Sequence, residues 1–438
     1  MVNQIKRVSV AEVRIWGQVV GAIGWDGSSN FGTFEFNPDF LETGLDLAPI
    51  MMPLERALAG ETRFEFRRLP FETYHGLPGL LSDSLPDKFG NDLINQWLVR
   101  MGRIQSDINP IERLCYTGKR GMGALEFRPV MQKELEESVQ VEVTRLVELA
   151  REVLNKRNSL EGDLFDDPTN AILNIIRVGT SAGGNRPKAV IAWNESTGEI
   201  RSGQVAAPKD FDYWIIKFDG VKDTSLNDPA GFGRIEYAYH LMARACGIDM
   251  TPCRLQEEGN RAHFMTRRFD RPGGKDKLHV SSLCGMAHYD FNMQGAYSYE
   301  QAFQVMRELR LPYTDAEQQY RRMVFNVIAR NQDDHTKNIA FIMDRQGGWR
   351  LSPAFDMTFA HNPAGKWTNR HQMTINGKSD GFTLADLYQV GREMNIKSYK
   401  SIVQQVRDVV AGWPQYAQEA GVGKEQTLGI GEAHRLML

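Results

Sequence analysis

Asn331-Gln332-Asp333-Asp334-His335-Thr336-Lys337-Asn338 is the stretch of this chain that best indicates its fold. It comes directly after a segment whose apolar residues recur at the spacing of a helix. After it come a predicted strand at residues 339–343, a turn at 344–348 and a second strand at 349–352. Ala354-Phe355-Asp356-Met357 then completes the unit. This order predicts a polar loop at a helix end, a hairpin, and an aspartate that returns to the loop.

The spacing of the polar residues suggests phosphoryl transfer. That reaction needs a carboxylate beside the accepting hydroxyl, and side-chain oxygens that hold Mg²⁺ against the nucleotide phosphates. Asp333 and Asn338 have the catalytic Asp-to-Asn interval of protein kinases, whereas Asp334 does not. We predict Asp333 as the base, and Asn338 with Asp356 as metal ligands. His335 is expected to orient the loop or to lie near the phosphates.

A simpler reading of the same residues remains open. Asp333, Asp334 and Asn338 could do no more than cap and solvate a helix-to-strand turn, where such residues are common. The hairpin and Asp356 favour the functional reading, because a motif gains weight from its structural context.

A glycine-rich stretch at residues 179–188 precedes a predicted strand at 189–193. Its glycines would let backbone N–H groups face an anion, and the hydroxyls of Thr180 and Ser181 could reach a phosphate. The stretch matches neither Walker A nor G-x-G-x-x-G, and by itself a hairpin turn explains it equally well. Its place upstream of Asp333 favours the phosphate-binding reading.

Lys217 lies near the end of an apolar strand predicted at residues 213–218. A buried ammonium group without an anion is costly, so we expect a carboxylate or a phosphate beside it. Glu236, early in the next predicted helix, is the natural partner in a kinase-like lobe. The alternatives are a lysine whose stem only reaches to solvent, and a glutamate that only complements a helix dipole.

Residues 267–271 follow an apolar strand, at the point where a hinge between two lobes would lie. Adenine would hydrogen-bond to the backbone there, or the segment is only a salt-bridged strand exit.

Residues 118–123 resemble a phosphate loop but precede a strand, and we interpret them as a turn. Residues 371–378 could face the cleft, although their spacing demands no chemistry.

Composition points to an ordinary folded chain. The 438 residues are 42% hydrophobic and 24% charged, which is typical of globular proteins of two or three domains. The net charge of −3 argues against unaided binding to nucleic acid, so DNA contact is expected to be local or through a partner. Nothing resembles a bilayer span or a signal peptide, and four scattered cysteines suggest neither disulfides nor zinc. We expect a cytoplasmic protein.

Strands dominate the first part of the chain and helices the part after residue 299, which predicts an α+β fold. Short strands are expected over residues 12–71, a helical segment over 80–101 and an amphipathic helix over 143–154. We place a domain boundary after residue 157. Residues 1–157 would form a β-rich domain with a helix. Residues 158–438 would form a two-lobed kinase domain whose N-lobe ends near residue 270.

Together these motifs resemble the HipA family of bacterial serine/threonine kinase toxins, and the resemblance covers nearly the whole chain. It is carried by several ordered segments: residues 80–86, 121–125, 181–188, 268–271, 333–338 and 355–356. The resemblance implies a protein-kinase-like fold that uses ATP and Mg²⁺. It also implies nucleotide contacts at Gly183, Gly184, Asn185, Arg186, Lys188, Lys217, Arg267, Phe269, His335, Asn338 and Asp356.

The resemblance further implies autophosphorylation of the phosphate loop at Ser181, with Thr180 as the alternative. Family members are inactivated in this way. They bind a small helix-turn-helix antitoxin that carries the operator specificity, and they phosphorylate translation components such as aminoacyl-tRNA synthetases. Two other functions stay open: a pseudokinase scaffold that binds an antitoxin and acts as a co-repressor, and a lipid kinase of the phosphoinositide type. The absence of a basic amphipathic membrane surface argues against the lipid kinase.

Overall fold

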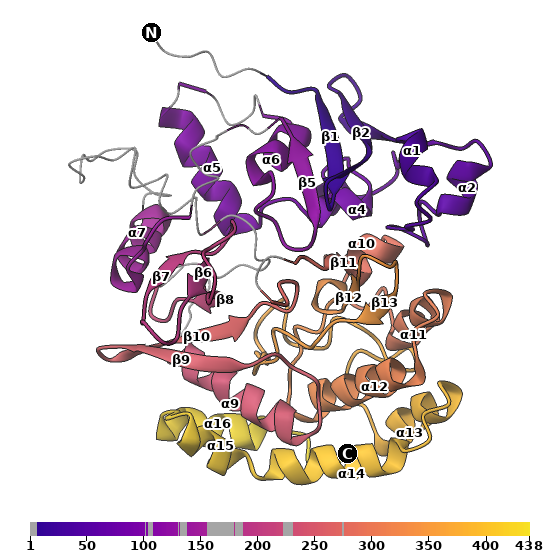
Figure 1. The fold of residues 1–438 in the computed structure, drawn as a ribbon. Coiled ribbons are helices and arrows are strands. Elements are labelled where there is room, and N and C mark those ends of the chain that lie inside the picture. The colour runs from indigo at the N-terminus through magenta and orange to yellow at the C-terminus, as the bar shows by residue number, and fades with distance from the viewer. Residues whose placement is uncertain are drawn as a thin grey trace.

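The computed structural model describes residues 7–100, 102–103, 108–129, 131, 138–155, 179, 187–221, 231–273 and 276–438. The N-terminal elements lie at the top of Figure 1, and the last helices lie at the bottom. Three antiparallel sheets and the helices around them make up this part of the chain.

The first sheet has the strand order β4-β3-β2-β1-β5. Buried and exposed positions alternate along β1, as expected for a strand with one face on a core. Trp16 and Gly17 both have positive φ and join β1 to β2 in a two-residue turn. The strands are β1 (Val10–Ile15), β2 (Gln18–Asp26), β3 (Phe31–Phe36), β4 (Arg63–Phe64) and β5 (Leu125–Arg128).

Helices fill the connections of this N-terminal part. They are α1 (Pro38–Leu41), α2 (Leu54–Leu58), α3 (Phe71–Tyr74), α4 (Gly79–Ser82), α5 (Lys88–Arg100) and α6 (Pro110–Thr117), followed by α7 (Val143–Asn155). The short helices α1 and α2 interrupt the region expected to be strands only. The helical segment expected over 80–101 is divided into α4 and α5, with Pro86 between them.

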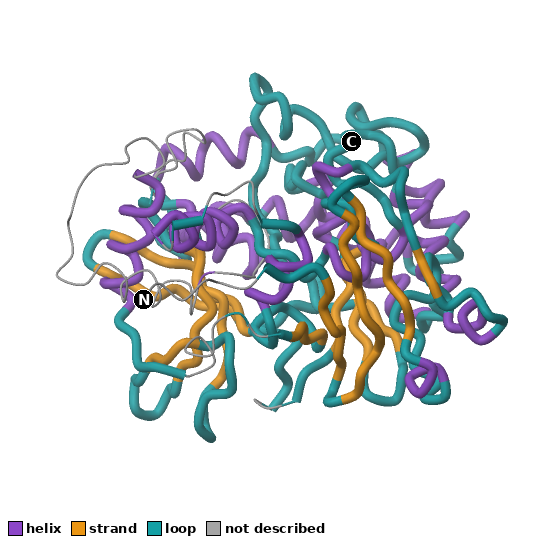
Figure 2. The backbone as a smooth tube through the Cα atoms, turned by 90° about the horizontal axis from the view of Figure 1, so that it is seen from above, coloured by secondary structure: helices purple, strands orange, loops and turns teal. Residues whose placement is uncertain are grey.

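The second sheet has the order β7-β6-β8-β10-β9 and forms a group separate from the first sheet in Figure 2. Helix α9 (Phe232–Ala245) contacts β10 and β9. The strands are β6 (Lys188–Trp193), β7 (Ile200–Ser202), β8 (Asp212–Lys217), β9 (Cys253–Glu258) and β10 (Arg261–Arg267). This sheet with its one long helix corresponds to the small lobe of a kinase-like fold.

The remainder is mainly helical. A small sheet, β11 (His279–Ser282), β12 (Ala340–Met343) and β13 (Trp349–Leu351), is the exception. The helices are α10 (Leu283–Ala287), α11 (Tyr299–Glu308), α12 (Tyr313–Ile328), α13 (Leu384–Glu393), α14 (Tyr399–Ala411), α15 (Trp413–Glu419) and α16 (Lys424–Ala433), with a 3-10 turn at Thr336–Asn338. The predicted α+β class is confirmed, with a β-rich N-terminal part and a mainly helical C-terminal lobe.

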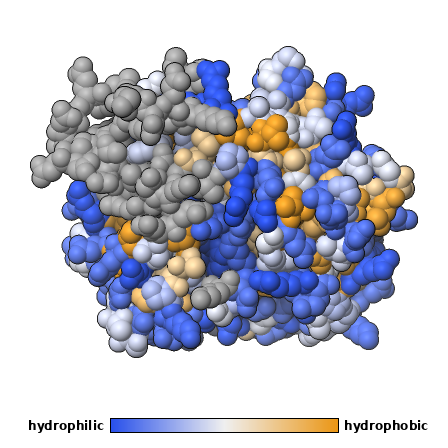
Figure 3. All heavy atoms as spheres, turned by 45° about the horizontal axis from the view of Figure 1, so that its top comes forward, coloured by the Kyte–Doolittle hydropathy of each residue, from blue (hydrophilic) through white to orange (hydrophobic). Residues whose placement is uncertain are grey.

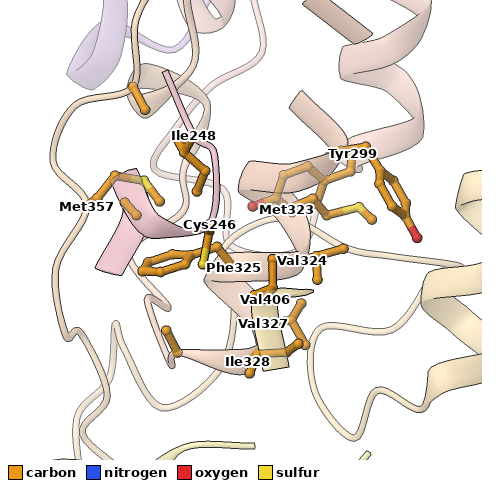
Figure 4. Close-up of a cluster of buried hydrophobic side chains, with 14 of the residues drawn as sticks. Cys246, Ile248, Tyr299, Met323, Val324, Phe325, Val327, Ile328, Met357 and Val406 are labelled. Atoms are coloured by element: carbon orange, nitrogen blue, oxygen red, sulfur yellow. The ribbon is translucent and has the colours of Figure 1, made fainter. Parts of the chain in front are cut away.

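The largest hydrophobic core surrounds α12. The side chains of Met323, Val324, Val327 and Ile328 are fully buried, as the apolar pattern before the polar loop predicts. Figure 4 shows them with residues from other elements, such as Val406 of α14. Because α12 is fixed on so many sides, the loop that follows it starts from a rigid position.

A second core joins the N-terminal part to the small lobe. Side chains of α5 and α7 pack on one face of β6 and β8. The members from the helices are Phe89, Leu93, Ile94, Trp97, Leu98, Leu146, Val147 and Ala150, and those from the strands are Ala189, Ile191, Trp214 and Ile216. We call this set the α5–β6 core.

Within the described ranges, no helix is long and apolar enough to cross a membrane. The face drawn in Figure 3 is largely hydrophilic, with hydrophobic residues in small separate groups. The cysteines are unpaired thiols, and Cys115, Cys246 and Cys284 are buried.

Candidate functional site

The polar loop after α12 is held in place by Asp334. Its side chain is 1% exposed and accepts hydrogen bonds from Tyr299 Oη at 2.8 Å and the Gln372 backbone N–H at 2.8 Å. His371 Nδ1 lies 2.7 Å from the same carboxylate. Thr336 adds a hydrogen bond from Oγ1 to the Tyr289 carbonyl at 2.6 Å. Asp334 is therefore structural, and it fixes the residue before it in the chain.

Asp333 differs from its neighbour because its side chain is 40% exposed. Its Oδ1 accepts a hydrogen bond from Trp367 Nε1 at 2.5 Å, and His335 Nε2 lies 3.8 Å from the same atom. Asn338 Nδ2 donates to the Asp333 carbonyl at 2.8 Å, which closes the loop. Asp333 thus presents an accessible carboxylate, as a base requires.

Asp356 follows the β12–β13 hairpin in a left-handed conformation with φ 52°. Its Oδ1 forms an ion pair with Lys217 Nζ, and Lys217 also lies 2.5 Å from Glu236 Oε1. Burial raises the pKa of Asp356, but Lys217 and then Lys188 outweigh it and hold that pKa at about 2. The charge of a protonated His335 in the polar loop acts in the same direction.

The sequence left two simpler explanations open: a Lys217 that only reaches to solvent, and a Glu236 that only complements a helix dipole. The surroundings of the two side chains exclude both. The Lys217 side chain is 15% exposed and is paired with two carboxylates, so it does not simply reach to solvent. Burial lowers the pKa of Lys217, yet Asp356 and Glu236 raise it above its ordinary value. Glu236 lies beyond the first turn of α9, which begins at Phe232, so a dipole role does not explain it.

Lys188 begins β6 and is 3% exposed. Its Nζ lies 3.8 Å from Asp87 Oδ2, whose side chain is also almost fully buried. Burial lowers the pKa of Lys188, and the carboxylates of Asp87 and then Asp356 oppose this shift. Asp87 Oδ1 accepts from the Gly90 N–H at 2.7 Å. The N-terminal part of the chain therefore supplies a carboxylate next to the predicted nucleotide site.

The hinge segment contains a buried ion pair. Arg268 and Asp270 are both 0% exposed and lie 2.6 Å apart. Asp270 also accepts from the Gly123 N–H at 2.8 Å, and Arg268 donates to the Gly121 carbonyl at 3.3 Å. The glycine-rich residues 118–123 are thus a turn docked on the hinge, which agrees with their interpretation as a turn.

The two hinge residues predicted to bind nucleotide lie in different surroundings. Arg267 pairs with the exposed Asp212 at 2.5 Å. The Phe269 ring lies 5.8 Å from that of Phe355, next to Asp356. Their roles toward adenine stay predictions.

Part of the predicted site falls outside the described residues. Thr180, Ser181, Gly183, Gly184, Asn185 and Arg186 are all in this group. Gly179 and Lys188, on either side, are described. A Cβ on Gly179 would lie 2.7 Å from Leu93 of α5, and Lys188 lies 3.8 Å from Asp87, which precedes α5. Both flanks of this stretch therefore lie beside the N-terminal half of α5.

The residues predicted to hold Mg²⁺ have suitable donor atoms. The Nδ2 group of Asn338 is used by the Asp333 carbonyl, which leaves the amide oxygen Oδ1 as the ligating atom. Asp356 adds a carboxylate with a low pKa, and oxygen donors of these kinds suit Mg²⁺. Among the described residues, no group of three His, Cys, Asp or Glu side chains could hold a metal. In phosphoryl-transfer enzymes of this kind, the nucleotide phosphates supply further oxygen ligands to the Mg²⁺.

Three neighbours of the site were not foreseen from the sequence. Asp87 carries no motif beyond its place before a helix, and Trp367 stands in an irregular polar segment. His371 was noted only as a residue that could face the cleft, whereas it is fully buried against Asp334. Each of these residues contacts a site residue that is far away in the sequence, and local sequence patterns do not reveal such contacts.

The small antiparallel lobe, the mainly helical lobe and the partly buried lysine between two acids define a protein-kinase-like fold. The family model of the HipA N-terminal domain matches residues 11–128, and that of the HipA-like C-terminal domain matches residues 180–413. The chain belongs to the HipA family.

Individual relatives are distant. The solved complex of the Shewanella oneidensis MR-1 toxin-antitoxin proteins HipA and HipB with operator DNA contains a chain with 16% identity and a TM-score of 0.61. That similarity covers 96% of this chain and 94% of the other. A protein named "Putative kinase Y4mE" from Sinorhizobium fredii is 24% identical over 125 residues. The match covers 26% of this chain and 30% of that relative.

Proposed function

We propose that this protein is an ATP- and Mg²⁺-dependent serine/threonine protein kinase that acts as the toxin of a toxin-antitoxin pair. The observation that carries the proposal is the position of Lys217, which joins Glu236 to Asp356 inside the fold. Protein kinases use a lysine–glutamate pair and a metal-binding aspartate in this combination.

Each residue has a defined task in this proposal. Lys217, oriented by Glu236, would hold phosphate oxygens, and Asn338 with Asp356 would hold the metal. Asp333 would accept the proton of the substrate hydroxyl. ATP supplies the phosphoryl group, and Mg²⁺ neutralises charge on its phosphates. The buried Asp334 supports this assignment, because it fixes the loop without taking part in the chemistry.

Intact-mass measurement with phosphosite mapping, after incubation with ATP and Mg²⁺, tests the proposal. We expect a mass increase of one or more phosphates, with a site at Ser181 or Thr180. Asp333→Asn and Asp356→Asn should lower the transfer rate by roughly 100-fold or more. Asp344→Asn is the matched control, because Asp344 lies in the exposed β12–β13 turn.

Unchanged transfer in both site variants would show that this assignment is wrong. Stabilisation by ATP without transfer would favour the pseudokinase scaffold instead. Phosphorylation of lipid vesicles, with no protein product, would favour the lipid kinase.

The cellular role extends the proposal. We propose that the protein acts in the cytoplasm, binds a small HipB-like helix-turn-helix antitoxin, and phosphorylates a translation component such as an aminoacyl-tRNA synthetase. Support comes from the family and from the complex of the Shewanella oneidensis relative. Growth arrest on expression, lost in Asp333→Asn and relieved by a co-expressed antitoxin, is the expected result. Growth unaffected by the active protein would exclude the toxin role.

A further inference from the structure

Trp367 lies in the irregular segment between Asp356 and α13, among residues that are mostly polar. It belongs to none of the hydrophobic clusters formed by the described residues. Core packing therefore does not explain why a large aromatic side chain stands here. Its polar contact is directed at the site, because the indole Nε1 donates to Asp333 Oδ1 at 2.5 Å.

The backbone of Trp367 is held from two sides. Its carbonyl accepts from Gln294 Nε2 at 2.8 Å and from Gln372 Nε2 at 2.5 Å. The backbone N–H of Gln372 in turn donates to Asp334 Oδ1 at 2.8 Å. The buried Asp334 thus fixes both the loop of Asp333 and the segment that carries the indole donor.

This arrangement has a consequence for the carboxylate of Asp333. A side chain that is 40% exposed can rotate, and rotation removes a base from the geometry it needs. A hydrogen bond from a fixed indole to one oxygen restricts that rotation. It leaves the other oxygen, Oδ2, to face a substrate hydroxyl.

We propose that Trp367 is a positioning residue that orients Asp333 for proton abstraction. The inference rests on the proposed function, since it needs Asp333 to be the base. The indole ring also lies 6.2 Å from the His335 ring, so the effect of the N–H must be separated from that of the ring. Trp367→Phe does so, because phenylalanine keeps an aromatic ring and removes the donor.

The kinetic test compares Trp367→Phe with the wild type and with Trp349→Phe. Trp349 is a suitable control because its indole also donates a single hydrogen bond, to the Asp46 carbonyl at 3.1 Å. We expect Trp367→Phe to lower kcat of phosphate transfer by roughly 10- to 100-fold, with KM for ATP unchanged. Trp349→Phe should retain the wild-type kcat. An equal kcat for Trp367→Phe in an active protein overturns the inference and leaves the proposed function intact.

A second measurement does not depend on activity. In protein labelled with ¹⁵N-tryptophan, the indole signal lost in Trp367→Phe identifies Trp367 among the eight tryptophans. Asp333→Ala should shift that signal upfield because the hydrogen bond is lost, whereas Asp344→Ala should leave it in place. A signal unmoved by Asp333→Ala overturns the inference. A wild type that transfers no phosphate overturns the proposed function, and with it the role of Trp367.

Discussion

Asp333 and Asp334 are adjacent in the chain, yet their surroundings assign them different tasks. Three donors enclose the Asp334 carboxylate, and Asp333 remains accessible. Kinase-type spacing selected Asp333 from the sequence alone. The structure adds the reason why Asp334 stands beside it.

Replacing Asp334 should affect folding more than replacing Asp333. Asp334→Ala leaves the buried groups of Tyr299, His371 and Gln372 without their acceptor, so the free energy of unfolding should fall by about 3 kcal/mol or more. Asp333→Ala loses one partly exposed hydrogen bond and should cost only about 1 kcal/mol. Urea unfolding measures both values. Equal losses for the two variants would contradict this division of roles.

The pairing of Lys188 with Asp87 also belongs to the scale of single residues. If Asp87 orients the Lys188 ammonium, Asp87→Asn and Lys188→Met should each weaken ATP binding. Their double variant should lose less than the sum, with a coupling free energy of about 1 kcal/mol. Calorimetric titration with ATP gives the Kd values. Asp39→Asn, in the exposed first turn of α1, serves as the control, and strictly additive losses would refute the coupling.

Among the secondary-structure elements, α13 offers a pH-dependent test. Asp386 completes a capping box with Thr383 and pairs with Lys378 at 2.8 Å. Burial raises its pKa, but the hydrogen bonds from Lys378 and Thr383 bring it down from 3.8 to about 2. Because the pKa is lower in the folded state, this carboxylate stabilises the fold above pH 3.8 and loses that effect as the pH falls toward 2.

Asp386→Asn should therefore lower the free energy of unfolding by roughly 1 to 2 kcal/mol near neutral pH. The difference from the wild type should shrink when urea unfolding is repeated at about pH 3. A difference that stays constant between the two conditions would show that the charge of Asp386 is not involved.

The hinge between β10 and β11 gives a prediction about buried charge. Asp270→Asn leaves the buried Arg268 guanidinium without its counter-charge and should cost about 3 to 5 kcal/mol in unfolding free energy. Asp212→Asn breaks the exposed pair with Arg267 and should cost less than about 1 kcal/mol. Thermal and urea unfolding compare the two. Comparable small costs would mean that the hinge pair contributes little.

The sequence predicted the long, regular elements well and the contacts between distant segments poorly. The burial of Met323 and Val327 follows from a helical period that needs only neighbouring residues. The short helices α1 and α2 lie in a region read as strands, because short helices have too few turns to show a period. Trp367 reaches Asp333 across 34 residues of irregular chain, and no spacing rule describes such a contact.

At the scale of the whole molecule, the α5–β6 core holds together the two regions that match the family models, residues 11–128 and 180–413. Leu93 and Trp97 from the first region bury apolar surface against Ile191 and Trp214 from the second. The proposed domain boundary after residue 157 lies within residues 156–178, outside the described part of the chain.

A protease site introduced at residues 160–165 tests this connection. After cleavage, the two pieces should still elute together in size-exclusion chromatography, because the shared core stays buried. Trp97→Asp, which places a charge in that core, should make them separate. Pieces that separate without any further change would show that the core does not hold them.

The contact between the two halves of the chain, made by the α5–β6 core and the Asp87–Lys188 pair, also limits how members of this family can diverge. Asp87 and the apolar face of α5 must suit the strand that begins at Lys188. A chimaera that joins the first half of one homologue to the second half of another would pair surfaces that were never selected together. Recombination near the middle of the gene should then yield few working proteins, whereas paired substitutions on both sides of this contact should be tolerated.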